Sequence, residues 1–225
     1  MEKETFEIKP IFYLAGFHLH RPDYNIKSIK GELYNFISEK TNRVFEIIPI
    51  DDHLEILKSA ENKLFEVRFE SSSLIYQDAD IEYGSFKDNA IEILKKWQSL
   101  SASSRRLKIA GILRKILLSK TAPKGVYSSR IYDHYLKNFN IQGKKKNLSL
   151  HLNYSYDKRG LDYNINLNID EVIKKNYSYE MRIDVNKFDF DRAGNIDLNK
   201  VMEIFEFAEK YFTEELFNDM DITIK

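Results

Sequence analysis

The residues of this sequence best suited to chemistry are the cations of its middle third. Lysine and arginine side chains neutralise phosphate groups, and nearby tyrosines can stack on bases. The candidate anion- or nucleic-acid-binding residues are Arg105, Arg106, Lys108, Arg114, Lys115, Lys144, Lys145 and Lys146. This segment has the composition of a phosphate-contacting surface but contains no recognised nucleic-acid-reading motif.

The basic segment stands out against a neutral chain. From Arg105 to Lys146 the sequence has twelve lysines and arginines and one acid, Asp133, whereas the whole chain has a formal net charge of zero. Such asymmetry marks either an anion-binding face or segments that neutralise one another after folding. We expect a salt-balanced surface, with nucleic-acid binding as the alternative.

Two patterns suggest metal binding, and neither is complete. His18 and His20 would project from one face of a strand, but no third ligand is near them in the sequence. The stretch at 189–200 resembles a calcium loop, yet it has Ala193 at position five and Lys200 at position twelve, where a glutamate is needed. We predict a turn here, followed by Asp197 as a helix cap, and we expect no metal or other cofactor.

No catalytic motif is present. The sequence has no G-x-S-x-G, no H-E-x-x-H and no glycine-rich phosphate loop. It has no cysteine, which excludes disulfides and thiol catalysis. We therefore name no catalytic residue and expect a protein that is not an enzyme.

Length and composition favour a globular protein. The chain has 225 residues, 43% of them hydrophobic and 13% aromatic, enough to bury a sizeable core. It has no run of about 18 apolar residues, and its start lacks the apolar core of a signal peptide. We expect a cytoplasmic protein with no membrane association.

The pattern of apolar residues predicts two similar halves. The first begins with a strand at 11–20 and a helix after Asn25. Further strands are expected at 44–50, 53–58, 64–70 and 74–77, before a helix that opens at Ser85 and buries Phe86, Ala90, Leu94 and Trp97.

The second half begins at the run 107–116. Its periodicity favours a helix, but Gly111 would cost about 1 kcal/mol there, and the Ala110-Gly111 pair matches Ala15-Gly16 of the first strand, so we expect a strand. A short helix can follow from Ser128 or Ser129. Clear alternation then predicts antiparallel strands at 148–156, 161–169 and 179–185, and the last helix begins near Asp197.

The expected fold class is α+β. Each half would contain a strand, a helix, an antiparallel meander and a helix, packed as a sheet and helix sandwich. The halves, 1–103 and 104–225, would form two intimately packed domains or a single one.

Two surfaces suggest self-association. The polar face of the meander carries short hydroxyl, imidazole and amide groups, which can pair with another copy without the desolvation cost of full charges. The last helix carries three apolar residues away from its main stripe: Met202, Phe207 and Phe217. They either face outward as an interface between two copies or are covered by another part of the same chain.

Several features together resemble an uncharacterised bacterial family of duplicated α+β proteins. They are the motif Tyr83-Gly84-Ser85-Phe86 before a helix, the strand 107–116, the late meander and a last helix finishing in FTEEL (212–216). The likeness covers residues 60–217. The second half is similar in element order to the SecB export chaperone, although two halves and a basic middle depart from SecB.

These observations rank the possible functions. We expect a non-enzymatic cytoplasmic interaction protein, either a homodimer or a subunit of a protein complex. The alternative is a nucleic-acid-binding accessory factor that uses the basic segment 105–146, and a SecB-like chaperone is the third possibility.

Overall fold

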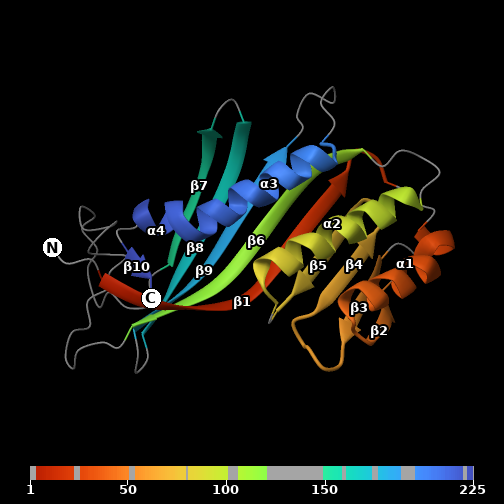
Figure 1. Ribbon diagram of the computed structural model, residues 1–225, viewed down its shortest axis with the longest axis horizontal. Helices are drawn as coiled ribbons and strands as arrows, with labels where there is room; N and C mark the ends of the chain where they lie inside the picture. Colours follow the sequence, from red (N-terminus) through yellow and green to blue (C-terminus); the bar gives the residue numbers. More distant parts are fainter. Residues whose placement is uncertain are drawn as a thin grey trace. The chain divides into compact units, whose positions relative to one another are not determined.

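The computed structural model describes residues 4–22, 26–50, 54–79, 81–100, 106–120, 149–158, 161–173, 177–188, 196–219 and 222–224. Figure 1 shows its elements. The strands are β1 (Glu4–Leu19), β2 (Phe45–Pro49), β3 (Leu54–Ser59), β4 (Glu66–Glu70), β5 (Ser73–Asp78), β6 (Leu107–Lys120), β7 (Ser149–Lys158), β8 (Leu161–Ile173), β9 (Tyr177–Phe188) and β10 (Ile222–Ile224). The helices are α1 (Ile26–Thr41), α2 (Tyr83–Ser99), α3 (Leu198–Lys210) and the short α4 (Leu216–Asp219). Within these ranges no helix combines the length and apolar character needed to cross a membrane.

The arrangement of the strands corrects the expected fold class. Nine strands are hydrogen-bonded in the order β2-β3-β4-β5-β1-β6-β9-β8-β7, and β10 pairs in parallel with the start of β1. The strands β1 and β6, which were predicted to open separate halves, are neighbours in this sheet. Because backbone hydrogen bonding continues from one to the other, the fold is dominated by a single, largely antiparallel sheet. It is not a balanced α+β sandwich of two halves.

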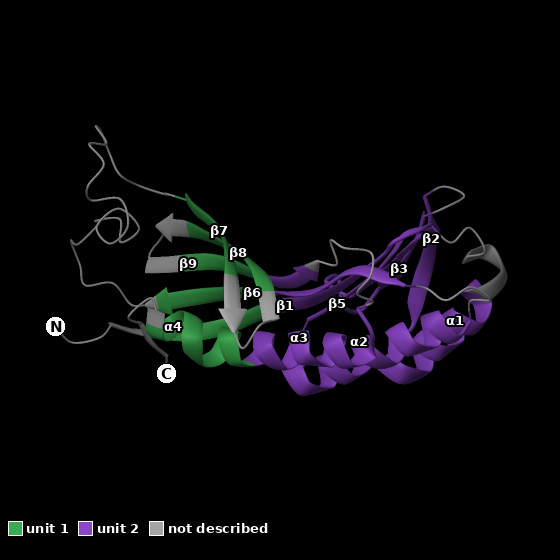
Figure 2. Ribbon diagram, turned by 90° about the horizontal axis from the view of Figure 1, so that it is seen from above, with its two compact units in different colours: residues 1–11, 114–184, 210–225 green, residues 12–113, 185–209 purple. Residues whose placement is uncertain are grey.

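The chain divides into two compact units, which Figure 2 colours separately. Unit 1 contains residues 1–11, 114–184 and 210–225, and unit 2 contains residues 12–113 and 185–209. Each unit gathers distant stretches because β1, β6 and β9 each contribute residues to both. The predicted boundary between residues 103 and 104 lies outside the described residues and stays a prediction.

In unit 2, the core lies on one face of the meander from β2 to β5. Each of these strands pairs antiparallel with the next, and β5 pairs with β1. The register places Ala15, Tyr76, Val67 and Leu57 side by side across four strands, and all four are buried. The ring of Tyr76 stacks on that of Phe86 in α2, with centroids 5.0 Å apart.

Helix α2 is nearly as predicted. It begins at Tyr83, two residues earlier than expected, with Glu82 at the N-cap, so Ser85 is not the capping residue. The hydroxyl of Tyr83 donates a hydrogen bond of 2.6 Å to the carbonyl of Phe205 in α3 and so ties the two helices together. The residues predicted to be buried on α2 are buried: Phe86, Ala90, Leu94 and Trp97.

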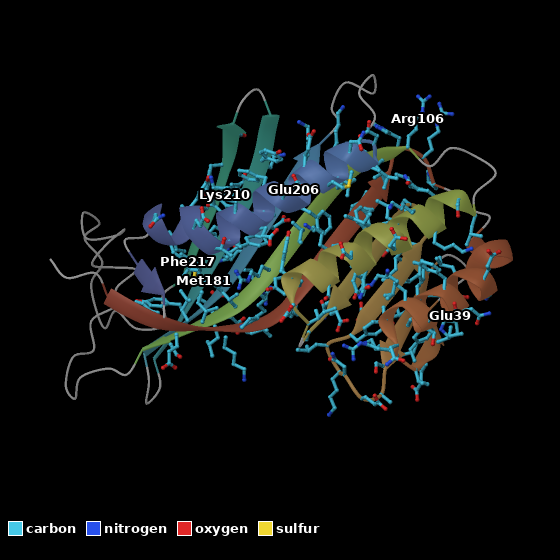
Figure 3. The ribbon with its side chains drawn as sticks, viewed as in Figure 1. Glu39, Arg106, Met181, Glu206, Lys210 and Phe217 are labelled. Atoms are coloured by element: carbon cyan, nitrogen blue, oxygen red, sulfur yellow. The ribbon has the colours of Figure 1, made fainter. Side chains whose placement is uncertain are left out.

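In unit 1, the strands predicted from the alternating pattern are present as β7, β8 and β9. Strands β7 and β8 pair antiparallel from Ser149 opposite Asp170 to Lys158 opposite Leu161. Figure 3 labels Met181 on β9 and Phe217 on α4, which are both buried. The core of this unit also includes Phe6, Ile116, Leu118, Ile165, Leu167, Ile169, Ile183, Phe212 and Leu216.

The segment Tyr211–Glu215, between α3 and α4, is a π-helical turn. The backbone N–H of Leu216 donates to the carbonyl of Tyr211, five residues earlier. Lys210 and Glu215, also five residues apart, form an ion pair of 3.7 Å. Such a turn holds one more residue than a turn of α-helix and therefore rotates every side chain that follows it.

Candidate binding surface

The described cations of the basic segment do not share one face. Arg106 and Lys108 are exposed at the start of β6, and Figure 3 labels Arg106 there. Arg114 is buried, whereas the next residue, Lys115, lies on the opposite face and forms a 2.6 Å ion pair with Glu180. Arg105, Lys144, Lys145 and Lys146 lie outside the described residues. The described part of the segment therefore lacks a continuous cationic surface.

Arg114 serves the core of unit 1. Only 8% of it is exposed, because it falls in the buried alternation of Ile112, Ile116 and Leu118. Its Nη1 donates a hydrogen bond of 3.1 Å to the carbonyl of Phe212, inside the π-helical turn. The guanidinium carbon also lies 6.0 Å from the centroid of the Phe212 ring. This position removes Arg114 from any surface that binds an external anion.

His18 lies in β1 and His20 directly follows the strand, and both are half-buried. Burial is the main cause that lowers the pKa of His18 below its ordinary value of 6.5, while the charge of Glu70 opposes the change and that of Lys108 adds to it. The nearby Ser73 hydroxyl donates to the Glu70 carboxylate at 3.0 Å. Among the residues that the structure describes, no group of three His, Asp or Glu side chains is placed to hold a metal ion.

The loop 189–200 is only partly described. Residues 189–195 lie outside the described residues, and Ile196 forms an isolated antiparallel bridge with Leu107. The Oδ1 of Asp197 accepts a hydrogen bond of 2.9 Å from the backbone N–H of Lys200, in the first turn of α3. The prediction that Asp197 caps the last helix is confirmed.

A buried polar cluster surrounds Asp78, which the sequence analysis did not single out. Its Oδ1 accepts hydrogen bonds from Arg43 at 2.8 Å and Asn62 at 3.2 Å, and its Oδ2 accepts one of 3.1 Å from the Tyr76 hydroxyl. Burial raises the pKa of Asp78, and the charge of Arg43 opposes that change. Burial and the Asp78 charge also raise the pKa of Tyr76. The sequence contains a pattern that indicates the burial of Asp78, because Leu74, Tyr76 and Asp78 occupy alternate positions on one face of β5.

The Asp78 cluster is satisfied from within the chain. Both carboxylate oxygens accept hydrogen bonds from protein donors, including the backbone N–H of Ala79 at 2.8 Å. Arg43 also places its guanidinium 5.2 Å from the centroid of the Phe65 ring. The cluster therefore holds the segment after α1 against the last residues of strand β5. This role is structural.

The three apolar residues away from the main stripe of the last helix do not behave alike. Phe207 and Phe217 are buried within the chain, and Met202 is 38% exposed. Phe217 follows the π-helical turn, which rotates it onto the buried side. Phe207 lies only about 60° around the helix from Ile204, so the buried stripe is wider than the sequence suggested. Phe207 and Phe217 are therefore core residues.

The polar face of the meander is present in unit 1. The register sets Ser149 beside Asp170, His151 beside Asn168, Asn153 beside Asn166, and Ser155 beside Asn164. The side chains from β7 are exposed and those from β8 are half-buried. The Ser149 hydroxyl donates to Asp170 at 2.6 Å, and Asn166 donates to Asp184 of β9 at 3.0 Å. This face is a ladder of short hydrogen-bonding groups with few full charges.

Strand β7 is also an end of the sheet, and the opposite end differs from it. In the described strand order, β7 and β2 are the two edges. Strand β2 has five residues and ends in Pro49, and both features discourage pairing with another strand. Strand β7 has ten residues, with no Asp, Glu, Lys or Arg from Ser149 to Tyr156. Natural edges are usually protected by such charges, so β7 is the less protected of the two edges within the described part of the chain.

The helix-facing side of β7 is incompletely covered by the described residues. Leu152 pairs with the buried Leu167 of β8, yet 39% of Leu152 is exposed. Next to it, the hydroxyl of Tyr154 hydrogen-bonds to that of Tyr211 in the π-helical turn. Strand β7 thus offers a backbone edge, an accessible leucine and a polar ladder together. This combination is the candidate binding surface.

Comparison with known proteins adds no family to these observations. No protein-family model matches the chain, and no curated protein matches it.

Proposed function

We propose that this protein is a non-enzymatic, cytoplasmic interaction protein that acts as a homodimer joined through strand β7. The observation that carries the proposal is the uncharged stretch of β7 at the edge of the sheet. An edge strand presents unpaired backbone N–H and C=O groups, which a strand from another chain can satisfy.

The chemistry of the two faces of β7 supports this proposal. On one face, the exposed part of Leu152 gains from burial against another apolar side chain. On the other face, the amide of Asn153 can exchange hydrogen bonds with a partner and loses little on desolvation compared with a full charge. Homodimers with twofold symmetry are the commonest protein assemblies, and their interfaces use the same surface twice.

The buried polar groups support a role other than catalysis. The Asp78 carboxylate and the Arg114 guanidinium each bind groups of the protein itself. Through these hydrogen bonds, both side chains stabilise the fold. Nucleic-acid binding is less well supported, because Arg114 is buried and Lys115 is paired with Glu180.

The test compares two matched substitutions. Leu152→Lys places a charge on the helix-facing side of the β7 edge, and Ile47→Lys does the same on the β2 edge, where Ile47 is 49% exposed. Light scattering after size-exclusion chromatography should find a wild-type species near twice the 26.7 kDa chain mass at tens of micromolar. We expect L152K to be monomeric and I47K to remain dimeric.

Three results would overturn the proposal. They are a monomeric wild type at this concentration, a dimer that L152K leaves intact, and copurifying nucleic acid that is required for association. The third, seen as a raised absorbance ratio at 260 to 280 nm, would favour the nucleic-acid-binding alternative.

A further inference from the structure

We infer that two copies of the chain pair β7 with β7 in antiparallel register, with Asn153 opposite Asn153 of the second copy. This inference rests on the proposed homodimer and specifies its geometry. The result would be a sheet that continues from one chain into the other, with the polar ladder on one face throughout.

Symmetry limits the possible registers. A twofold axis perpendicular to the sheet keeps each face of β7 continuous with the same face of its copy. Side chains alternate between faces along a strand, so each residue must lie opposite a residue of the same parity. The register is then fixed by naming the one residue that lies opposite itself. The central candidates are His151, Leu152, Asn153 and Tyr154.

The length of β7 favours an axis at Asn153 or at Tyr154 over the other two. With Asn153 at the axis, every residue from Ser149 to Asp157 lies opposite a residue of the same strand in the second copy. With Leu152 at the axis, this matched stretch shortens to Ser149–Ser155. With His151 it shortens further, to Ser149–Asn153. With Tyr154 at the axis the matched stretch, Leu150–Lys158, is as long as that about Asn153, but it sets the charged Lys158 opposite Leu150. Each additional pair adds backbone hydrogen bonds or side-chain contacts, so the Asn153 register, which has a longest stretch without this mismatch, is the most stable.

The side chains agree with this choice. An Asn153 pair at the axis can exchange amide hydrogen bonds, since each amide both donates and accepts. On the helix-facing side, Leu152 would lie opposite Tyr154 of the second copy, an aliphatic–aromatic pair of the kind that stabilises neighbouring strands. An axis at His151 would instead set two imidazoles directly opposite one another.

The absence of charge from Ser149 to Tyr156 indicates a copy rather than a charged partner. A strongly acidic or basic peptide would find no opposite charge along this stretch, whereas a copy supplies matching hydrogen bonds and apolar contacts. Pairing through one strand buries less surface than a standard stable interface, so the dimer should be weak and its population should depend on protein concentration.

The register can be tested with single cysteines, because the chain has none of its own. The variants are His151→Cys, Leu152→Cys and Asn153→Cys, with Ile47→Cys on β2 as the control. A disulfide requires Cα atoms within about 7 Å of each other. In the proposed register only position 153 lies opposite itself, and position 152 is displaced from its copy by about 7 Å along the strand, in addition to the spacing between strands.

We expect oxidation of N153C to convert most of the protein into a covalent dimer. The variants H151C, L152C and I47C should form little or no covalent dimer. Spin labels on the same cysteines provide a second measurement, and the distance between labels should be shortest at position 153. If the protein is dimeric but position 151 or 152 cross-links best, or none of the three does, this register is wrong and the proposed dimer stands. If the protein is monomeric and no position cross-links, both proposals fail, and a different chain or another segment of this chain covers the edge.

Discussion

The guanidinium of Arg114 in strand β6 donates a 3.1 Å hydrogen bond to the carbonyl of Phe212, in the middle of a helix. A carbonyl within a regular α-helix accepts from the N–H four residues later. The π-helical turn changes this pattern, since Leu216 donates to Tyr211 instead. Arg114 therefore supplies a donor where the helix changes its register, and the turn and the buried cation stabilise each other.

We expect Arg114→Met to lower the free energy of unfolding by about 2 kcal/mol, because it removes a charged hydrogen-bond donor from a buried site. The exposed Arg106 provides the control, and Arg106→Met should change stability by less than about 0.5 kcal/mol. Urea denaturation of both variants measures the difference. Equal stability of the two variants would show that Arg114 does not support the helix.

A second prediction concerns the last helix. Phe217 lies in α4 and its side chain is buried, so Phe217→Ala should lower the free energy of unfolding by about 3 to 5 kcal/mol. Met202 is exposed on α3, and Met202→Ala should be nearly neutral. Thermal unfolding distinguishes them. A neutral Phe217→Ala variant would place this ring outside the core, at the outward position that was one of the two alternatives from the sequence.

Local patterns predicted much of unit 1, because alternation is a property of neighbouring residues. The strands expected at 161–169 and 179–185 are observed as parts of β8 and β9. The burial of Arg114 follows the same rule once β6 is a strand. Phe217 escaped prediction because a helical projection assumes a constant 100° per residue, and the π-helical turn breaks that assumption.

Long-range features were beyond the sequence patterns. The pairing of β1 with β6 joins segments about ninety residues apart. The residue pattern of either strand does not specify which other strand it pairs with. For the same reason, the sequence predicted the polar face of β7 and β8 but not that β7 lies at the edge. The Asp78 cluster combines Arg43, Asn62 and Tyr76 from separate elements, so only the buried position of Asp78 itself was readable.

The lowered pKa of His18 predicts a dependence of stability on pH. Above the ordinary value of 6.5, His18 is neutral in both the folded and the unfolded chain. As the pH falls below that value, the unfolded chain takes up a proton first, so this contribution to stability is lost as the pH falls through the lower pKa of the folded state. Glu70 and Lys108 are the charged groups that act on it.

His18→Gln should remove this contribution. The difference in free energy of unfolding between wild type and variant should be constant above the ordinary pKa and should decrease as the pH falls below it. Urea denaturation at a series of pH values measures it. A difference that does not change with pH, or one that grows as the pH falls, would contradict the lowered pKa.

The last prediction compares the glycines of the two Ala-Gly pairs, Ala15-Gly16 and Ala110-Gly111. A methyl group at Gly111 in β6 would lie 2.6 Å from Cβ of Asn186 and 3.1 Å from the carbonyl of Val185, both in β9. A methyl group at Gly16 in β1 would have its nearest neighbour 4.0 Å away, at Cδ2 of Leu14. Only Gly111 therefore permits a close approach of neighbouring chain segments. We expect Gly111→Ala to lower the free energy of unfolding by about 1 to 3 kcal/mol, the usual cost of forcing extra atoms into a packed site. Gly16→Ala should stay within about 0.5 kcal/mol of wild type. Denaturant unfolding of both variants makes the comparison. If Gly111→Ala is as stable as Gly16→Ala, β6 and β9 are farther apart at this point than the structure has them.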